Sequence, residues 1–391
     1  IEAREPIINT ANAGGGFEYS DAYLFDNDSR FVFNFVRSAM DAGCTAANYV
    51  SSRGATRVDD MWEAQLRDEM QQETFTLKAK VLINACGPFV DTHNQYTGQR
   101  TEYRHVFSKG VHLIVDRIVD NARVLAFFAS DGRLFFVIPM GRKTCIGTTD
   151  TRTNDPNEKI TDEDRQFILD NANRLLDVPK PLTKEDIIAE RCGVRPLAVN
   201  GDGTSSDWLN LSRKHKIESN ESAKHLSIFG GKLTDCINVG EEVAECVAGL
   251  GVVLPDASAL WYGEPDASVR DAFFERAAAM NLDALTWEGA AEPLSQRYWR
   301  RYGKRAFAML DAIEKNASQA DIVIEDAEYT RCEITYTRDN EMITKLEDFL
   351  RRRSKTALVV RRDVLAQSRG LKKVCWMFFG NAAGERFHEY F

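Results

Sequence analysis

The sequence lacks any apolar run long enough to cross a membrane, and it lacks a signal peptide, so we expect a cytosolic protein or one held peripherally on the inner membrane face. It also lacks an excess of basic residues. The 59 acidic and 50 basic residues leave a net charge of −9, which argues against nucleic-acid binding. No two of the eight cysteines form a CxxC pair, so we expect free, mostly buried thiols rather than disulfides or a metal site.

An initiator methionine is also missing, because the first residue is Ile1, and this favours a truncated or processed chain. Gly14, Gly15 and Gly16 lie in a loop-like context and do not form a dinucleotide-binding fingerprint. The chain has 391 residues, of which 43% are hydrophobic and 28% charged. This composition is that of an ordinary globular protein with two or three domains.

The most informative segment is 229–234, where two glycines separate a predicted buried strand from a predicted helix. Gly230 and Gly231 carry no Cβ and let the backbone approach a ligand closely. A helix that begins here directs unpaired N–H groups and the positive end of its dipole toward that ligand, which favours an anion such as a reduced flavin. Lys232 adds a full positive charge. A helix cap at a tight turn explains the same pattern without any ligand.

The hydrophobic pattern predicts an α/β part interrupted by an antiparallel sheet and followed by helices. Strands are predicted over 46–50, 61–66, 74–79, 80–85, 111–115, 133–138, 144–149, 187–196 and 226–229, with a hairpin at 139–143. Helices are predicted from a cap within 26–28 to about Gly43, and over 160–176, 265–280, 294–307, 308–315 and 335–352. The first of these helices is expected to bury Phe31, Val32, Phe35, Val36 and Met40.

Two side chains stand out as candidates for binding and proton transfer. Arg195 lies between an apolar strand and Pro196, and its planar fork matches a phosphate or a carboxylate; the alternative is a structural ion pair. His112 has a pKa suited to accepting a proton from a hydroxyl during hydride removal; the alternative is a hydrogen-bonded core histidine.

Two turns and one basic run are further candidates. Residues 84–88 follow a predicted strand, where nucleotide-binding sheets place ligands, and 147–150 end another strand with two hydroxyls and a carboxylate. Ordinary turn chemistry accounts equally for both. Residues 351–355 are strongly basic, which suits a solvated helix end or, as a second interpretation, contact with anionic lipid headgroups.

In this order, the segments resemble the FAD-dependent glycerol-3-phosphate dehydrogenases and the related glycerophosphate oxidases. The matching segments are 16–21, 83–88, 109–112, 146–150, 193–197, 229–234 and, in the predicted helical part, 347–353. The resemblance covers nearly the whole chain. It implies an incomplete glutathione-reductase-like α/β FAD domain, an antiparallel-sheet substrate domain and a C-terminal helical domain.

The resemblance also implies domain boundaries. Residues 1–25 begin the substrate-domain segment, 26–97 belong to the FAD domain, 98–205 form the antiparallel-sheet substrate domain, 206–255 return to the FAD domain with the glycine turn, and 260–391 form the helical domain.

The resemblance implies roles for particular residues. Arg195, Arg213 and Lys232 resemble the cations of the substrate site, and His112 resembles the histidine that helps to deprotonate the C2 hydroxyl. The cofactor contacts that it implies are Val50, Ala85, Gly87, Gly230, Gly231, Lys232, Leu233 and Thr234.

The implied reaction is oxidation of sn-glycerol 3-phosphate to dihydroxyacetone phosphate, with a hydride passing to flavin N5 and the electrons passing to a quinone or to oxygen. The resemblance implies no metal, allows peripheral membrane contact and allows a homodimer. An amine or amino-acid oxidase of the same flavin class is an alternative, because arginine also suits a carboxylate.

One departure from the family pattern is large. The family begins with a strand–GxGxxG–helix unit for the FAD pyrophosphate, and no such unit occurs in this sequence. We therefore expect either a fragment of a longer enzyme or a chain without tight FAD binding of its own, including a non-catalytic scaffold. Two smaller departures are Cys86, where the family often has threonine, and Phe89, where it often has tryptophan.

Overall fold

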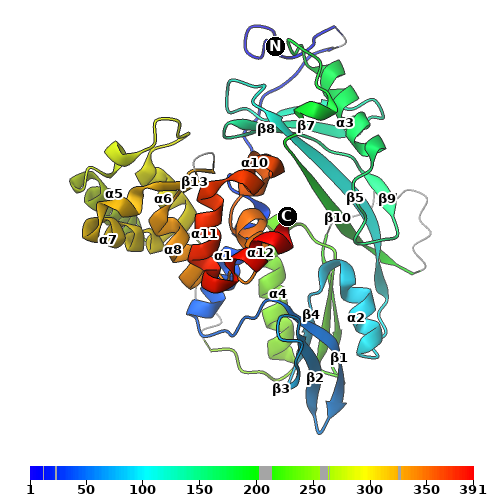
Figure 1. Ribbon diagram of the computed structural model, residues 1–391. Coiled ribbons are helices and arrows are strands. Elements are labelled where there is room, and N and C mark those ends of the chain that lie inside the picture. The colour runs from blue at the N-terminus through cyan, green and yellow to red at the C-terminus, as the bar shows by residue number, and fades with distance from the viewer. Residues whose placement is uncertain (12, 23, 202–213, 256–262, 264, 325–326) are drawn as a thin grey trace.

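A computed structural model of the protein describes residues 1–11, 13–22, 24–201, 214–255, 263, 265–324 and 327–391. The chain forms an antiparallel sheet region, a smaller α/β region and a helical region, which Figure 1 shows at the upper right, at the bottom and at the left and centre. The α/β class and the helical C-terminal part agree with the sequence-based prediction.

The largest sheet has the strand order β10-β5-β8-β7-β6, and β9 pairs with β5. Helix α3 (Asp162–Leu175) begins with a capping box between Thr161 and Asp164, and it covers one face of the sheet with Ile168 and Leu169 fully buried. The predicted hairpin at 139–143 is confirmed, because β7 and β8 pair as far as Met140 and Lys143. The strands are β5 (Tyr103–Asp116), β6 (Leu125–Phe128), β7 (Leu134–Met140), β8 (Lys143–Gly147), β9 (Thr151–Thr153) and β10 (Ala189–Asn200).

The α/β region contains a three-stranded sheet in the order β11-β12-β4 and an antiparallel meander, β1-β2-β3. Strand β4 runs parallel to β12, with Asn84 opposite Ser227, as the sequence predicted. The predicted burial of this strand is wrong in part, because Asn84 is buried while Ile83 is 40% exposed. Its bounds and those of its neighbours are β1 (Val50–Val58), β2 (Met61–Asp68), β3 (Thr74–Ala79), β4 (Leu82–Asn84), α2 (Val90–Tyr96), β11 (Lys216–Asn220), β12 (His225–Phe229) and α4 (Cys236–Gly249).

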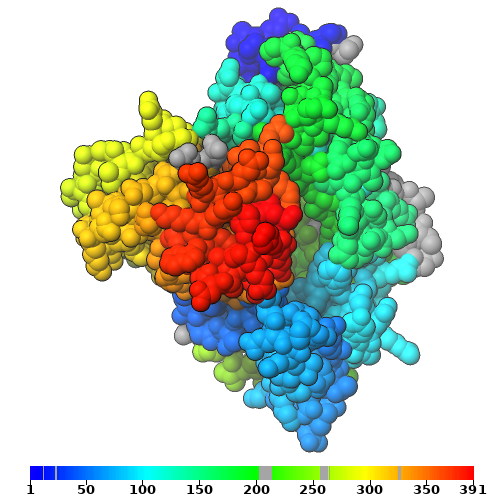
Figure 2. Space-filling view, viewed as in Figure 1, coloured from blue at the N-terminus to red at the C-terminus, as the bar shows by residue number. Residues whose placement is uncertain are grey.

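The helical region packs around two apolar clusters, one centred on Phe273 and Tyr298 and the other on Phe349 and Leu371. In Figure 2, helices from the end of the chain fill the space between the rest of this region and the sheet. The elements are α5 (Ala267–Ala279), α6 (Leu294–Tyr302), α7 (Phe307–Lys315), β13 (Ile322–Ile324), β14 (Tyr329–Thr330), α8 (Arg331–Asn340), α9 (Thr356–Val359), α10 (Arg362–Gln367), α11 (Arg369–Phe379) and α12 (Ala383–Tyr390).

Helix α1 (Asp28–Asp41) belongs to this helical packing although it comes early in the chain. Asn27 caps it by accepting a hydrogen bond from the Arg30 backbone N–H, as the sequence led us to expect near 26–28. The predicted apolar face is wrong in part, because Phe33 is buried while Val32 is 45% exposed. The Arg30 guanidinium bonds to Glu341 at 2.6 Å. Because this ion pair is buried, α1 turns Arg30 and Phe33 inward instead of the predicted apolar face.

Three other expectations are corrected. The strand predicted at 46–50 begins only at Val50, and the helix predicted over 335–352 is two segments, α8 and a π-helical turn at Asp348–Arg353. The Asp348 carboxylate accepts the backbone N–H groups of Thr344 and Lys345, which starts a new turn and breaks the helix. All eight cysteines are free, but only Cys145, Cys332 and Cys375 are buried.

Within the residues that the structure describes, no helix has the length and apolarity needed to span a bilayer. The same part of the chain holds no cluster of three or more histidine, cysteine or acidic side chains placed to bind a metal ion.

Candidate active site

The candidate site lies on one face of the paired strands β5 and β10. The register places His112 opposite Arg191 and Ser108 opposite Arg195, with Gly110 opposite Gly193 between them. Because side chains alternate along a strand, these residues share one face of the sheet. The opposite face carries Val111 and Leu113 into the core beneath α3.

Arg195 extends along this face across Gly110. A Cβ on Gly110 would lie 2.6 Å from one terminal guanidinium nitrogen of Arg195, so the absence of a side chain there makes room for the guanidinium. One guanidinium nitrogen lies 3.7 Å from the Asp150 carboxylate, and the Ser108 hydroxyl donates to the same Asp150 oxygen. The Arg195 side chain is 37% exposed, so it is oriented by these contacts and still accessible to a ligand.

The His112 imidazole lies in the same place, packed over another glycine. A Cβ on Gly147 would come within 3.0 Å of the His112 ring, and Gly147 has a φ of +147°, which suits glycine. Burial, together with the charges of Arg191 and Arg195, lowers the pKa of His112 to about 4. The imidazole is therefore neutral near pH 7 and able to accept a proton.

Arg191 is a site residue that the sequence analysis missed. It projects beside His112, and one of its guanidinium nitrogens lies 3.0 Å from Asp28 at the start of α1. The signal was present in the sequence, because Arg191 and Arg195 are four residues apart in a predicted strand and must share a face. The structure also places Asp150, from the predicted turn 147–150, against Arg195.

The candidate cofactor turns meet at one edge of the small sheet. Strands β4 and β12 are parallel neighbours, so Ala85 and Gly87 after β4 lie beside the Gly230–Thr234 turn after β12. Gly230 and Gly231 have φ values of +61° and +94°. The 3₁₀ turn Leu233–Asp235 and the start of α4 have no side-chain cap, and the backbone N–H groups of Asp235 and Cys236 donate to the carbonyls of Lys232 and Leu233. The positive end of the α4 dipole lies at this turn and favours an anionic ligand.

Two histidines hold this turn in place. The Gly230 N–H donates to Nε2 of His105 at 2.9 Å, which puts the His105 proton on Nδ1, 3.3 Å from Asp91. His215 lies between Asp235 at 2.6 Å and Glu242 at 2.7 Å, and hydrogen bonds to these carboxylates raise its pKa. A glycine turn held in this way fits a flavin, because neither glycine carries a Cβ and the ring system can approach the backbone closely.

The other residues proposed from the sequence lie elsewhere. The turn exposes Lys232, Leu233 and Thr234. Lys232 does not lie beside His112, where the second cation is Arg191. Val50 is half-buried at the start of β1, next to Tyr49, whose hydroxyl bonds to Asp348. Arg213 lies outside the described residues.

The depressed pKa of His112 predicts a specific pH dependence of stability. Its pKa is about 4 when folded against 6.5 when exposed, so the unfolded chain binds the extra proton first as the pH falls. The contribution of His112 is therefore complete above pH 6.5 and is lost between 6.5 and 4. Between about pH 7 and pH 5, we expect the free energy of unfolding of the unmutated protein to fall by about 1 to 2 kcal/mol more than that of His112→Gln.

Urea unfolding at both pH values measures this difference. His225, whose pKa burial also lowers to about 4, remains in both proteins, so the variant keeps part of the slope. Parallel loss of stability in the two proteins would show that His112 is not held neutral by its surroundings.

Comparison with known proteins gives the family. The model of the FAD dependent oxidoreductase family matches residues 1–212, and the model of the C-terminal domain of alpha-glycerophosphate oxidase matches residues 266–374. The aerobic glycerol-3-phosphate dehydrogenase of Staphylococcus aureus (strain USA300) is 28% identical over 379 residues, covering 93% of this chain. The chain spans 66% of the length of that relative.

A solved structure has the same architecture. The glycerol-3-phosphate dehydrogenase from Bacillus halodurans, complexed with FAD, superposes with a TM-score of 0.78 at 25% identity, covering 100% of this chain and 76% of that one. The first family model alone accounts for 212 of the 391 residues. This chain therefore belongs to the FAD-dependent oxidoreductase family.

Proposed function

We propose that this protein oxidises sn-glycerol 3-phosphate to dihydroxyacetone phosphate with FAD. The observation that carries the proposal is the neutral imidazole of His112 beside the guanidinium of Arg195, on one face of β5 and β10 and adjoined by Arg191. This face offers a proton acceptor and fixed positive charge, as a phosphorylated secondary alcohol requires. The names of the Staphylococcus aureus and Bacillus halodurans relatives support the same substrate and, for the second, the same cofactor.

In this proposal, each residue has a separate task. Arg195, oriented by Asp150, binds the phosphate with its planar fork. His112 accepts the proton of the C2 hydroxyl as the carbonyl forms. When bound, FAD supplies the two-electron acceptor that takes the C2 hydride.

The Gly230–Thr234 turn and residues 85–87 would hold the cofactor by close backbone approach at Gly87, Gly230 and Gly231, and Lys232 adds positive charge at the same turn. Arg213 as a further substrate cation and Val50 at the adenine end remain proposals. So do the domain boundaries at 25, 97, 205 and 255, contact with a membrane surface and a homodimer.

A flavin absorbance spectrum tests the proposal. Purified protein with added FAD should show the flavin bands in a bound form, and these bands should bleach when glycerol 3-phosphate is added without an acceptor. Reoxidation by oxygen or only by a soluble quinone then identifies the acceptor. A bound flavin that bleaches with amino acids and not with glycerol 3-phosphate would favour an amino-acid oxidase instead, because Arg195 would then bind a carboxylate.

Gly110 provides a finer test of the role of Arg195. In Gly110→Ala the new methyl group overlaps the Arg195 guanidinium and moves it without removing its charge. We expect the KM for glycerol 3-phosphate to rise about tenfold, since one misplaced charged hydrogen bond costs about 1.5 kcal/mol.

Gly193→Ala is the matched control, because Gly193 is the cross-strand partner of Gly110 and a Cβ there meets no atom within 4 Å. Steady-state kinetics and a melting temperature for both variants complete the test. Equal KM values in the two variants would contradict the assignment of Arg195 to phosphate binding.

A further inference from the structure

A second site lies away from the candidate active site, where the β7–β8 hairpin meets the helical region. It is a cavity of about 320 Å³, within the size range of small-ligand sites. Part of its lining is apolar and includes Phe25, Met140, Ile188, Val359, Val360 and Val364. Six cations also line it: Arg142, Lys143, Arg300, Arg301, Lys355 and Arg361.

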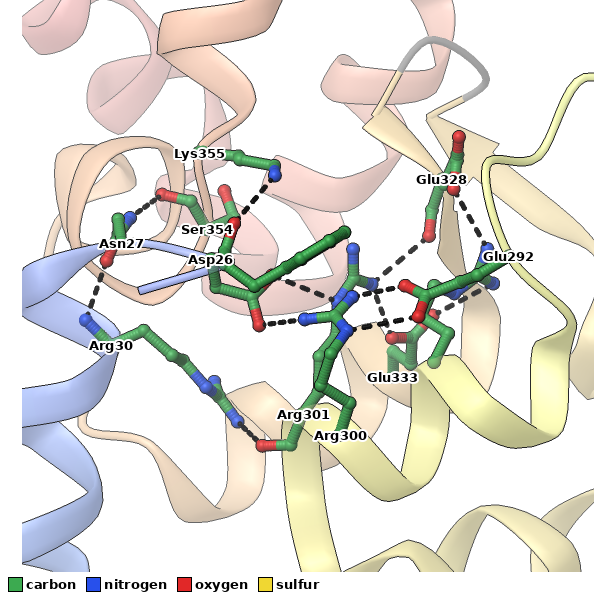
Figure 3. A network of polar contacts seen from close by, with 12 residues as sticks. Asp26, Asn27, Arg30, Glu292, Arg300, Arg301, Glu328, Glu333, Ser354 and Lys355 are labelled. Carbon is green, nitrogen blue, oxygen red and sulfur yellow. Dashed lines mark hydrogen bonds and ion pairs between the residues drawn. The ribbon is translucent and has the colours of Figure 1, made fainter. Parts of the chain in front are cut away.

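Three of these cations are neutralised by carboxylates. Lys143 pairs with Asp116 at 2.6 Å, and Arg300 pairs with Asp26 at 2.5 Å and also with Glu292. Arg301 pairs with the buried Glu333 at 2.7 Å. Figure 3 shows Asp26, Glu292 and Glu333 converging on the two arginines.

The other three cations have no carboxylate within ion-pair distance in the described part of the chain. The Lys355 ammonium donates to the carbonyl of Phe25 at 3.1 Å and lies over the Phe25 ring. Arg361 donates to the carbonyls of Ile187 and Glu185, and Arg142 lies over the ring of Trp287. The cavity wall thus carries positive charge that the protein itself does not balance.

The remaining acids of the wall do not remove this excess. Arg300 holds Glu292, and Glu328 lies 3.5 Å from the buried Arg297. The pKa of Lys355 is lowered to about 8, chiefly by burial, with Arg301 and Arg300 acting in the same direction and Asp26 and Glu292 against it. An anion that contacts Lys355 would stabilise its charged form, which burial disfavours.

We propose that this cavity binds a phosphate monoester that carries an apolar group. The guanidinium of Arg142 and the ammonium of Lys355 suit the phosphate oxygens, and the aliphatic wall suits the organic part. His112, Arg191 and Arg195 are not among the residues that line the cavity, so the inference does not rest on the proposed function. The same chemistry is found in soluble phosphate esters and in the headgroup of phosphatidic acid, and the experiment separates these sources.

Calorimetric titration with phenyl phosphate tests the site in the full chain. The titration uses the Arg195→Met background, which weakens the candidate substrate site. We expect one phenyl phosphate per chain, and about tenfold weaker binding in Lys355→Met and in Arg142→Gln, a loss equivalent to about 1.4 kcal/mol. Inorganic phosphate should bind more weakly than phenyl phosphate, because it cannot use the apolar wall.

Matched controls come from α11, outside the cavity. Lys372→Met removes a lysine that also lies over a ring, that of Phe387, and Arg369→Gln removes an exposed arginine; both should leave the affinity unchanged. Melting temperatures identify any variant that misfolds. If Lys355→Met misfolds, Arg142→Gln still tests the site, because Arg142 is exposed on the hairpin and its replacement should leave the fold intact.

Vesicles separate the two sources of the ligand. Binding of soluble phenyl phosphate that depends on Lys355 supports the site with a free ester as its ligand. Binding only to phosphatidic acid vesicles, absent with phosphatidylcholine and lost in Lys355→Met, supports it with a lipid headgroup. The absence of binding in both arms, or binding that Lys355→Met and Arg142→Gln leave unchanged, would overturn the proposal.

Discussion

Arg195→Met should lower kcat/KM for glycerol 3-phosphate by about 30-fold to 1,000-fold, since breaking a hydrogen-bonded charge contact costs about 2 to 4 kcal/mol. The variant keeps the length of the side chain and leaves Gly110 uncrowded, so the strands should keep their pairing. The kcat/KM of Arg195→Lys should lie between that of the unmutated protein and that of Arg195→Met, because an ammonium keeps the charge but not the planar fork. Steady-state kinetics of the flavin-loaded protein measures all three.

Arg276→Met is a suitable control for this experiment. Arg276 is exposed to a similar extent, 31% against 37%, and it pairs with Asp311 and Glu314 on the surface of the helical region. Its kinetics should be unchanged. If Arg195→Met retains the kcat/KM of the control, Arg195 is an ion-pair partner of Asp150 and not a substrate ligand.

The second large effect is expected on stability, from Glu333→Gln. Glu333 is fully buried and accepts hydrogen bonds from Arg301 at 2.7 Å and from the backbone N–H of Thr330 at 2.9 Å. Burial alone would raise the pKa of Glu333, but Arg301 and Arg297 hold it below its usual value. The amide would remove the nearest carboxylate of the buried Arg301 (Figure 3), leaving it only Asp26 at 3.7 Å, and would leave Arg297 only Glu328 at 3.5 Å. We therefore expect a loss of about 3 to 5 kcal/mol of unfolding free energy.

Urea unfolding of the two proteins measures this loss, with Glu314→Gln as the control. Glu314 makes a bond of the same kind, to Arg276 at 2.6 Å, but on the surface, where water replaces the lost partner. Its variant should unfold at nearly the same urea concentration as the unmutated protein. Similar shifts for Glu333→Gln and Glu314→Gln would mean that water reaches the buried arginines and that the network contributes little.

The position of this network explains why its loss should be large. Arg30 reaches it from α1, and the Arg30 guanidinium donates to the carbonyl of Arg301 while it pairs with Glu341. Asn27 bonds to the carbonyl of Ser354 at 2.7 Å, which joins the same helix to the end of the π-helical turn. The network therefore connects segments more than 300 residues apart in the chain and fixes α1 in the helical region. Asp28, at the start of α1, in turn pairs with Arg191 on β10.

Much of the local structure follows from the sequence alone. The hairpin at 139–143, strand 74–79 and the cap near Asn27 depend on neighbours within a few residues, and the structure has each of them where the pattern predicts it. The Gly230–Gly231 turn is of the same kind, because only glycine adopts its positive φ values without strain. His112 and Arg195 were also identifiable, since a histidine and an arginine in adjoining apolar strands are unusual.

Contacts between distant segments decided the rest. The helix predicted over 335–352 breaks because Asp348 bonds to Tyr49 as well as to its own neighbours, and α1 turns Phe33 inward because Glu341 binds Arg30. The register of β5 against β10 places Arg191 beside His112, and no local pattern gives that register. A backbone turn is set by short-range sterics, whereas an ion pair or a strand register is set by which distant partner offers the complementary charge and shape.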